Sequence, residues 1–368
     1  MPSLTKQSLI RLFITTLVIL SLTGCEYMQN LVGGDETENN NNVNETENPK
    51  ELVSLSLAVA PYVAWMPWYL ANEEGVFQEY REKYNIDVQF VSGDYESTIR
   101  KFINREVHAV VISNIDAIAN FVREDIEADV ILVMGYSNGN ETLLVNDDTG
   151  RFDLRDKEIA LAQNGSRHYL LDRYLIKNQI DFDRVNVQNA RDIDIPTIFV
   201  SGEVYGVVAG NPNSAKLINE QKAKLMFDSR RIPDEIMYLL VVRREVLQEN
   251  PQFSQVLLAA WFSVVERLQG SRKGSTTRAM SQLANIEHDN FTNQLNTVNL
   301  NDTPIKSLSA IRNDRLMRLA MRHIRYFVER HELTGNEPFS SWVSYPGRTP
   351  ALVHFNSKPL QSYVTKAR

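Results

Sequence analysis

Residues 52–70, LVSLSLAVAPYVAWMPWYL, join a strand pattern to a cluster of aromatic side chains. Apolar residues at 53, 55, 57 and 59 alternate with small ones, and this period of two predicts a β-strand that packs on both faces. Pro61 ends the strand, and Pro67 fits a helix only in its first turn. We therefore expect residues 62–66 in the loop or helix start that follows the carboxyl end of the strand.

Strands and helices alternate along the rest of the chain. Strand patterns recur at 86–91, 108–113, 129–136, 158–163, 185–190, 204–210 and 223–229, and an apolar run follows at 236–242. Helical patterns separate most of them, which predicts right-handed βαβ crossovers and a mostly parallel sheet. From Arg243 onward the pattern is mainly helical, and the Pro- and Gly-containing segment 343–356 is expected to be a loop.

This order predicts an α/β fold of two lobes, the second inserted into the first. Lobe 1 would contain residues 51–136 and 237–368, and lobe 2 residues 137–236. The segments GYSNGN (135–140) and DSRRIPDE (228–235) are expected to be the two crossing strands. Because open α/β sheets bind ligands outside the carboxyl ends of their strands, we expect a ligand cleft between the lobes.

The first 24 residues have the features of a signal peptide. Lys6 and Arg11 precede the apolar run LFITTLVILSL, and LTGC (22–25) resembles the bacterial lipobox, which is cut before a cysteine that then receives a lipid. Residues 25–50 are polar and rich in Asn and Glu, which predicts a flexible tether. The alternative is a chance cysteine after a simple signal or anchor.

Charge, cysteine content and the motifs in the sequence argue against several classes of function. A net charge of −7 argues against nucleic-acid binding, and the single cysteine, Cys25, allows no intramolecular disulfide. We find no nucleotide-binding or nucleophile motif and no His, Cys and Asp pattern at metal-ligand spacing. The sequence therefore predicts a binding protein without cofactor or metal, rather than an enzyme.

Candidate ligand-binding residues occur mainly near the expected carboxyl ends of strands. They are Tyr62, Trp65, Trp68, Asn114, Asp116, Ser137, Asn138, Ser166, Arg167, Glu203, Asn211 and Glu235.

Each candidate also has a structural interpretation. The tryptophans and Tyr69 share a helical face and could pack in the core, with Trp68 undecided between core and ligand site. The residues in SNIDA (113–117) could cap the helix that follows, and the two glutamates could be surface acids. His168 is expected to be structural. Ser166 lies at a helix start whose backbone N–H groups could bind an anion.

The whole body, roughly residues 52–335, resembles a known family. The segments that carry the likeness are AWMPWYLANEEGVFQEY (64–80), SNIDAI (113–118), NGSRHYLL (164–171) and GEVYGVVAGNP (202–212). In this order they resemble the substrate-binding lipoproteins of ABC importers for nitrate, sulfonates, taurine and thiamine pyrimidines. YSNGNETLLV (136–145) and FDSRRIPDEIMYLLVVRREVLQENP (227–251) are most similar to putative urea importer proteins associated with urea carboxylase, for which guanidine is an alternative cargo.

The resemblance implies a periplasmic-binding-protein-like fold of type II. It also implies a monomer outside the cytoplasm, lipid-anchored through Cys25, that delivers a small solute to an ABC permease and its ATPase. Relatives carry an acidic residue and then a tryptophan where Tyr205 and Gly210 stand. The alternatives are a sulfonate, nitrate or pyrimidine binder, a sensory lipoprotein, and a pyrimidine-precursor synthase on the same scaffold.

The candidate residues contain chemistry for two kinds of cargo. Urea or guanidinium would require acceptors such as Asp116 and Glu203 with the face of Trp65 above the plane. A sulfonate, nitrate or carboxylate would require Ser166, Arg167 and the helix amides. Both sets are present in the sequence.

Overall fold

The computed structural model describes residues 52–146, 153–221, 223–335 and 337–366. The predicted signal peptide, Cys25 and the tether lie outside the described residues. Lys50–Arg368 forms a compact unit distinct from Met1–Pro49, and both sheets and their cores belong to it. Among the described residues, none of the helices combines the length and the apolar character needed to cross a bilayer.

The larger of two sheets is built from both ends of this unit. In spatial order its strands are β12 (Val343–Ser344), β13 (Val353–Phe355), β4 (Ala128–Ser137), β10 (Met237–Arg243), β3 (Ala109–Ser113), β1 (Val53–Val59) and β2 (Ile86–Ser92), and β11 (Val298–Leu300) pairs with β4. β1 is parallel to both of its neighbours, as the alternation of strands and helices predicts.

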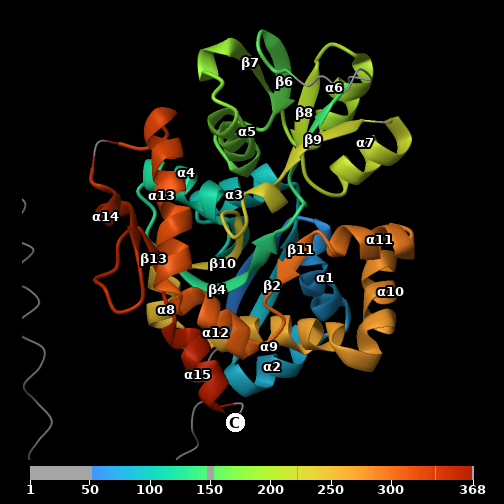
Figure 1. The fold of residues 1–368 in the computed structure, drawn as a ribbon. Helices are drawn as coiled ribbons and strands as arrows, with labels where there is room; N and C mark the ends of the chain where they lie inside the picture. Colours follow the sequence, from blue (N-terminus) through green and yellow to red (C-terminus); the bar gives the residue numbers. More distant parts are fainter. Residues whose placement is uncertain (1–51, 147–152, 222, 336, 367–368) are drawn as a thin grey trace, which may run out of the picture. The chain divides into compact units, whose positions relative to one another are not determined.

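The smaller sheet comes from the middle of the chain. Its order is β7 (Val185–Asn189), β6 (Lys157–Leu161), β8 (Gly206–Ala209), β5 (Thr142–Val145) and β9 (Lys224–Asp228). Figure 1 shows the two sheets, each with its own helices. The α/β fold with two lobes is therefore confirmed, whereas the lobe boundaries at 136/137 and 236/237 stay a prediction.

The strands that follow the two crossings depart from the expected parallel arrangement, and the short β11 is also antiparallel to β4. β10 is antiparallel to β3 and β4, and β5 is antiparallel to β8 and β9. Each is the first strand that the chain forms after it crosses from one sheet to the other. It therefore starts at the edge of the sheet where its two neighbours, which run in the opposite direction, end. Neither crossing is the continuous strand that was expected. β4 ends at Ser137 and β5 begins at Thr142, and the second crossing contains a 3-10 helix, η3 (Ser229–Arg231).

Helices connect the strands and cover the sheets. In the first part of the chain they are α1 (Met66–Glu73), α2 (Val76–Tyr84), α3 (Tyr95–Ile103), α4 (Asn114–Arg123), α5 (Ser166–Lys177), α6 (Ile195–Ser201) and α7 (Asn213–Gln221), with the 3-10 helices η1 (Val63–Trp65) and η2 (Phe182–Arg184). After the second crossing come α8 (Arg244–Glu249), α9 (Pro251–Val265), η4 (Glu266–Leu268), η5 (Gly270–Arg272), α10 (Lys273–Leu283), α11 (His288–Leu295), α12 (Pro304–Arg312), α13 (Asp314–Arg330), α14 (Phe339–Trp342) and α15 (Lys358–Lys366).

The larger sheet is buried on both faces, and β3 and β10 are buried along their whole length. This agrees with their continuous apolar runs. The C-terminal segment was expected to be a loop, but it contributes β12 and β13 to this sheet. Proline and glycine interrupt the segment at 346–350, and Val353–Phe355 then pairs with β4 because that edge of the sheet offers free backbone groups.

Candidate functional site

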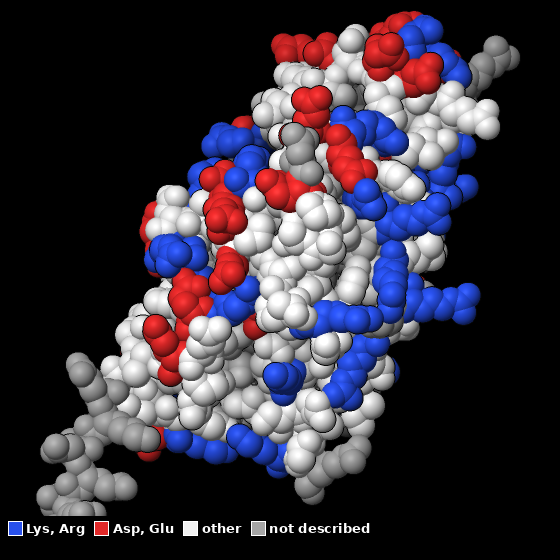
Figure 2. Space-filling view, turned by 90° about the vertical axis from the view of Figure 1, so that its left-hand side faces the viewer, with Lys and Arg blue, Asp and Glu red and all other residues white. Residues whose placement is uncertain are grey.

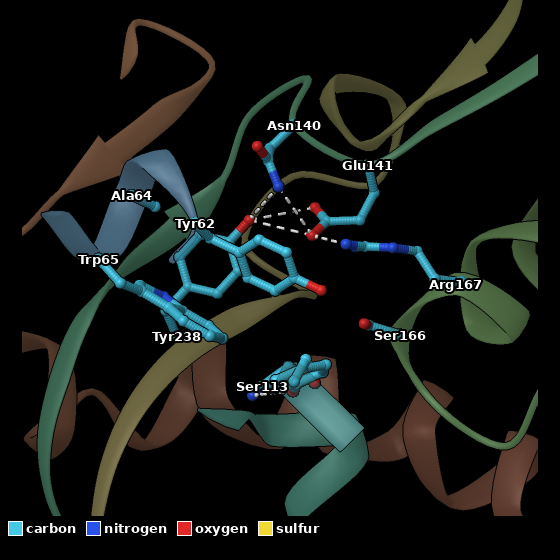
Figure 3. Close-up of a pocket in the computed structure, with 10 residues that line it drawn as sticks. Tyr62, Ala64, Trp65, Ser113, Asn140, Glu141, Ser166, Arg167 and Tyr238 are labelled. Carbon is cyan, nitrogen blue, oxygen red and sulfur yellow. Dashed lines mark hydrogen bonds and ion pairs between the residues drawn. The ribbon is translucent and has the colours of Figure 1, made fainter. Parts of the chain in front are cut away.

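A small pocket lies where the two sheets face each other at the ends of β1 and β3. Its lining residues are Tyr62, Ala64, Trp65, Tyr95, Ser113, Asn140, Glu141, Ser166, Arg167 and Tyr238 (Figure 3). The cavity volume is only about 10 Å³. This is roughly the volume that a single water molecule needs. The side chains of the pocket therefore fill it in this conformation.

Aromatic rings form one wall of the pocket. Tyr62 is extended and precedes η1, so the chain turns directly after β1 and places Trp65 at the start of α1. The Tyr62 ring lies 4.9 Å from that of Trp65 and 5.5 Å from that of Tyr95. Tyr238 of β10 meets Trp65 edge to face at 5.9 Å. Such pairs stabilise a rigid wall beyond the area they bury.

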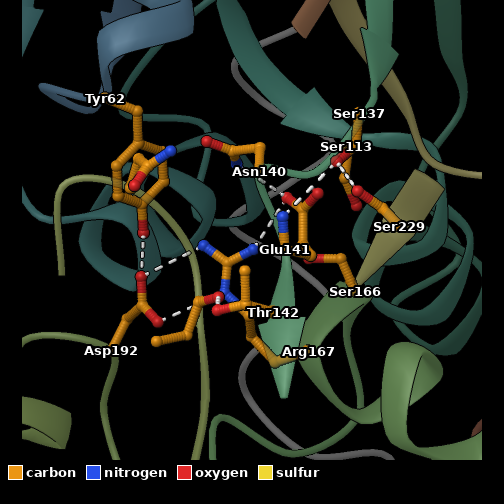
Figure 4. Close-up of polar contacts among 12 residues, drawn as sticks. Tyr62, Ser113, Ser137, Asn140, Glu141, Thr142, Ser166, Arg167, Asp192 and Ser229 are labelled. Atoms are coloured by element: carbon orange, nitrogen blue, oxygen red, sulfur yellow. Dashed lines mark hydrogen bonds and ion pairs between the residues drawn. The ribbon is translucent and has the colours of Figure 1, made fainter. Parts of the chain in front are cut away.

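A buried ion-pair network faces this wall. The guanidinium of Arg167, in the first turn of α5, donates from Nη1 to Glu141 Oε1 at 2.8 Å. From Nε and Nη2 it donates to the two carboxylate oxygens of Asp192, both at 3.3 Å. The three side chains are only 7%, 2% and 6% exposed. Figure 4 shows the guanidinium held between the two carboxylates.

Two tyrosine hydroxyl groups also belong to the network. Tyr62 donates to Asp192 Oδ2 at 2.6 Å, and Tyr238 donates to Glu141 Oε1 at 3.0 Å. Burial raises the pKa of both phenols well above the usual value, and the neighbouring carboxylates raise it further. Burial opposes the charge of Arg167, but Asp192 and Glu141 outweigh it and raise its pKa. The phenols therefore remain donors and the guanidinium remains charged.

A third carboxylate, Asp116, lies beside the pocket in the first turn of α4. Ser113 donates to its Oδ2 at 2.5 Å and the backbone N–H of Ser166 at 3.3 Å. Burial raises the pKa of Asp116, against the effect of these hydrogen bonds. Gly165 makes the approach possible, because a Cβ at that position would lie 1.9 Å from Asp116 Oδ1.

Gly210, at the end of β8, plays a similar part for Arg167. A Cβ on Gly210 would lie 2.3 Å from Arg167 Nη2 and 2.7 Å from the central guanidinium carbon. Only a residue without a side chain allows the guanidinium to lie in this position against the backbone. The glycine at position 210 therefore has a structural consequence inside the site.

Several hydrogen bonds at the site join the two lobes. Tyr62, which follows β1, is bonded to Asp192, which follows β7. The bond between Ser166 and Asp116 likewise connects α5 with α4. The carboxyl end of the larger sheet is thus held against that of the smaller sheet in a closed arrangement. A groove of about 490 Å³ between α3, α4 and the loop 162–167 leads from the site toward the surface.

The structure brings together four of the predicted residues in the pocket, namely Tyr62, Trp65, Ser166 and Arg167. Asp116 lies in the adjoining groove. Whether they bind ligand stays a prediction.

Other candidates have structural partners at the crossings. Asn114 bonds the backbone of Glu235 and Met237, and Ser137 bonds Ser229. Asn138 donates to Asn299, while Asn211 donates to Thr297 and accepts bonds from the start of α7. The carboxylate of Glu235 pairs with Arg173 and accepts from Tyr169. None of them is among the lining residues of the pocket.

Two placements differ from what the sequence indicates. Trp68 is fully buried in the core, where it packs on Trp261 at 5.2 Å and its Nε1 donates to Met134 Sδ at 3.3 Å. Pro67 lies in the first turn of α1, and the next residue already points inward. Glu203 is exposed and precedes β8, so it lies at the opposite end of that strand from the pocket. The expected placement of Glu203 at the cleft beside Asp116 and Trp65 is therefore wrong.

Sequence reasoning missed Tyr95, Asn140, Glu141, Asp192 and Tyr238. Tyr95 and Asp192 follow β2 and β7, and Glu141 comes directly after the first crossing, so the strand-end rule could have found them. Tyr238 sits inside an apolar strand that gives no such signal. In the part of the chain that the structure describes, no group of three His, Cys, Asp or Glu side chains could hold a metal ion.

Comparisons with known proteins agree with this architecture. The alkanesulfonate-binding protein of Xanthomonas axonopodis pv. citri superposes with a TM-score of 0.65 at 13% identity, over 77% of this chain and 96% of that one. The periplasmic aliphatic sulphonate-binding protein of Escherichia coli gives 0.63 at 14% identity, over 77% and 94%. A Candida albicans protein with the generic periplasmic binding protein fold gives 0.58 at 12% identity, over 76% and 95%.

At these identities the structures show a shared fold alone, the one that solute-binding proteins of ABC importers use. No curated protein matches the chain. The model of the NMT1-like family matches residues 48–285, which is more than half of the sequence. The chain therefore belongs to the NMT1-like family and has the periplasmic binding protein fold.

Proposed function

We propose that this protein is the solute-binding component of an ABC importer and that its cargo is a small, planar compound rich in N–H groups, such as guanidinium or urea. The observation that carries the proposal is the guanidinium of Arg167, held between two buried carboxylates. The same proposal includes a partner permease and its ATPase, a lipid on Cys25 and a location outside the cytoplasm.

The charge balance of the site supports a cationic or N–H-donating cargo. Three carboxylates, those of Asp116, Glu141 and Asp192, surround the single guanidinium of Arg167. A buried charge is stable only when it is paired and hydrogen-bonded. A cationic ligand would balance the excess negative charge, and a neutral N–H donor such as urea would bond the acceptor oxygens. An anion would increase the excess.

The aromatic wall supports a planar ligand. The guanidinium carbon of Arg167 already lies over the Tyr62 ring, 5.9 Å from its centroid. A planar cationic ligand stacked on the rings of this wall would gain an attraction of the same kind. The indole N–H of Trp65 has no hydrogen-bond partner among the described residues, so a ligand with a carbonyl oxygen, such as urea, would offer it an acceptor.

Sulfonate binding is the main alternative, since two of the similar folds are those of sulfonate-binding proteins. It would use Arg167 and the N-terminus of α5. In this structure, however, Arg167 donates to Glu141 and Asp192, and the N–H of Ser166 donates to Asp116. These donors would have to leave carboxylates that remain buried, which is unfavourable for an anion.

Capture would occur through lobe closure. Opening must break the bonds that Tyr62 and Ser166 make across the cleft, and it exposes the carboxylates to solvent. A ligand favours the closed state only if it binds that state more tightly than the open one. Contacts with both sides of the cleft, through Tyr62 on one lobe and Asp192 on the other, would provide this difference. Such a cycle includes no chemical step, and we propose a binder rather than an enzyme.

Isothermal titration calorimetry with guanidinium, urea, methanesulfonate and nitrate tests the proposal. We expect saturable binding of guanidinium or urea and none of the anions. Replacing Asp192 by Asn should weaken binding about tenfold to a hundredfold, because a hydrogen bond to a charged group is lost. Glu203→Gln, which changes an exposed acid at the far end of β8, is the matched control. Tight binding of methanesulfonate with no response to guanidinium or urea would refute the assignment of the cargo.

A further inference from the structure

The outward face of α13 carries a regular row of arginines. Arg315, Arg318, Arg322 and Arg325 are all exposed and follow one another at intervals of three or four residues, so they lie on one side of the helix. We call these four residues the α13 basic face. Leu319 and Tyr326 lie among them and are 55% and 49% exposed.

The opposite face of the helix is fixed to the protein. Met317, Ala320, Met321, Ile324, Phe327 and Val328 are at most 2% exposed. Phe327 also meets the rings of His168 and Tyr169 in α5 edge to face, at 5.3 and 5.5 Å. Because this apolar stripe is buried, α13 cannot turn its arginines inward, and the basic face is presented permanently to the surroundings.

The charge of this region contrasts with that of the whole chain. Residues 305–330 contain seven Lys or Arg and two Asp or Glu, although the chain as a whole has a net charge of −7. Figure 2 views the side of the molecule on which α13 lies in Figure 1. It shows Lys and Arg in a column along one part of this face, with most of the Asp and Glu elsewhere.

A groove of about 580 Å³ adjoins the basic face. Arg325 and Arg348 line it together with the apolar parts of Pro338, Phe339, Val343 and Tyr345. Two guanidinium groups therefore stand beside aromatic and aliphatic surface, and that of Arg325 also pairs with the exposed Glu329 at 2.6 Å. This combination suits an anionic headgroup attached to an apolar body.

We propose that the α13 basic face and this groove form a docking surface for an anionic phospholipid membrane. Arginines near such a surface are attracted by its negative potential, and exposed Leu and Tyr side chains partition into the interface. Exposed apolar residues between the arginines favour a lipid surface over an acidic protein segment, for which charge alone would suffice. Docking through α13 would hold the protein in one orientation on the membrane.

Vesicle sedimentation tests this proposal with the compact unit Lys50–Arg368, which excludes any contribution from residues 1–49. Vesicles of phosphatidylcholine with about 30 mol% phosphatidylglycerol should bind the unit, and pure phosphatidylcholine should not. Binding should disappear at high salt, since the attraction is electrostatic. The triple variant Arg315→Glu, Arg322→Glu, Arg325→Glu should bind at least about a hundredfold more weakly.

A second triple variant is the matched control. Arg272→Glu, Lys273→Glu and Arg278→Glu change the charge by the same amount at exposed positions on and beside α10, which lies away from α13 (Figure 1). We expect this variant to retain most of the binding. Equal loss in both variants, equal binding to neutral vesicles, or no binding to either vesicle would overturn the proposal. In the last case an acidic protein surface would become the candidate partner. Unchanged circular dichroism of both variants verifies that they fold.

Discussion

Replacement of Arg167 by Met removes the cation that pairs with Glu141 and Asp192 while keeping an unbranched side chain. Glu141 and Asp192 are then left facing each other with side chains 2% and 6% exposed. Removal of one partner from a buried ion pair costs about 3–5 kcal/mol, because the remaining charge is unpaired. In a unit of this size the loss corresponds to a fall in melting temperature of about 5–8 °C.

Guanidinium in solution should reverse part of this loss. If the proposed cargo can take the place left by the side chain of Arg167, millimolar guanidinium chloride will pair with the two unpaired carboxylates. It will then raise the melting temperature of the variant by mass action. Differential scanning fluorimetry at several guanidinium concentrations measures this rescue.

Arg173→Met is the control, since Arg173 lies on the same helix and pairs with Glu235 through bonds of 2.7 and 3.0 Å outside the pocket. It should also be destabilised, but guanidinium should rescue it far less. A stable Arg167→Met protein would refute the view that the network needs its cation. Equal rescue of both variants would show that guanidinium acts without regard to the pocket.

Three further changes test the site and its surroundings. Tyr62→Phe removes a hydrogen bond of 2.6 Å between the lobes and should weaken ligand affinity about tenfold to a hundredfold in calorimetry, because the closed state loses about 1.5–3 kcal/mol. Gly165→Ala should also weaken binding, since its Cβ would collide with Asp116, whereas Gly274→Ala, with open space around it, should leave affinity unchanged. Burial lowers the pKa of His168 to about 4, so the folded state takes up the proton at a lower pH than the unfolded chain does. Stability should therefore fall by about 3 kcal/mol between pH 6.5 and 4 in urea titrations, and His168→Gln should reduce this fall.

Much of the fold could be predicted because local patterns and global packing agree. The period-two alternation at 53–59 gives β1, and Pro67 lies at the start of α1 as expected. Strand direction was harder to foresee. Nothing in the apolar run that became β10 indicates its orientation, which is set by the side from which the chain returns after the second crossing. Similarly, β13 exists because an edge of β4 is available to it.

The site was predictable only where a functional group follows a strand. Tyr62, Trp65, Ser166 and Arg167 were found by that rule. The same rule misplaced Glu203, because the residue precedes its strand. Trp68 and Trp65 are three residues apart in the same aromatic cluster, yet one packs on Trp261 and the other lines the pocket. Sequence spacing cannot separate these roles, since the direction of each side chain depends on the turn that η1 introduces.

The electrostatic character of the site depends on two residues that have no side chain. Gly210 lets the Arg167 guanidinium reach Asp192, and Gly165 lets Asp116 reach the N-terminus of α5. A larger residue at position 210 would displace the guanidinium from Asp192 and make its N–H groups available to an anion. With glycine there, the same groups are occupied by carboxylates, and the free hydrogen-bonding capacity of the site is mainly that of acceptors. An anion site could also use Arg167. Because position 210 is glycine, however, the Arg167 guanidinium can pair with Asp192, and the site would then select N–H donors over sulfonates.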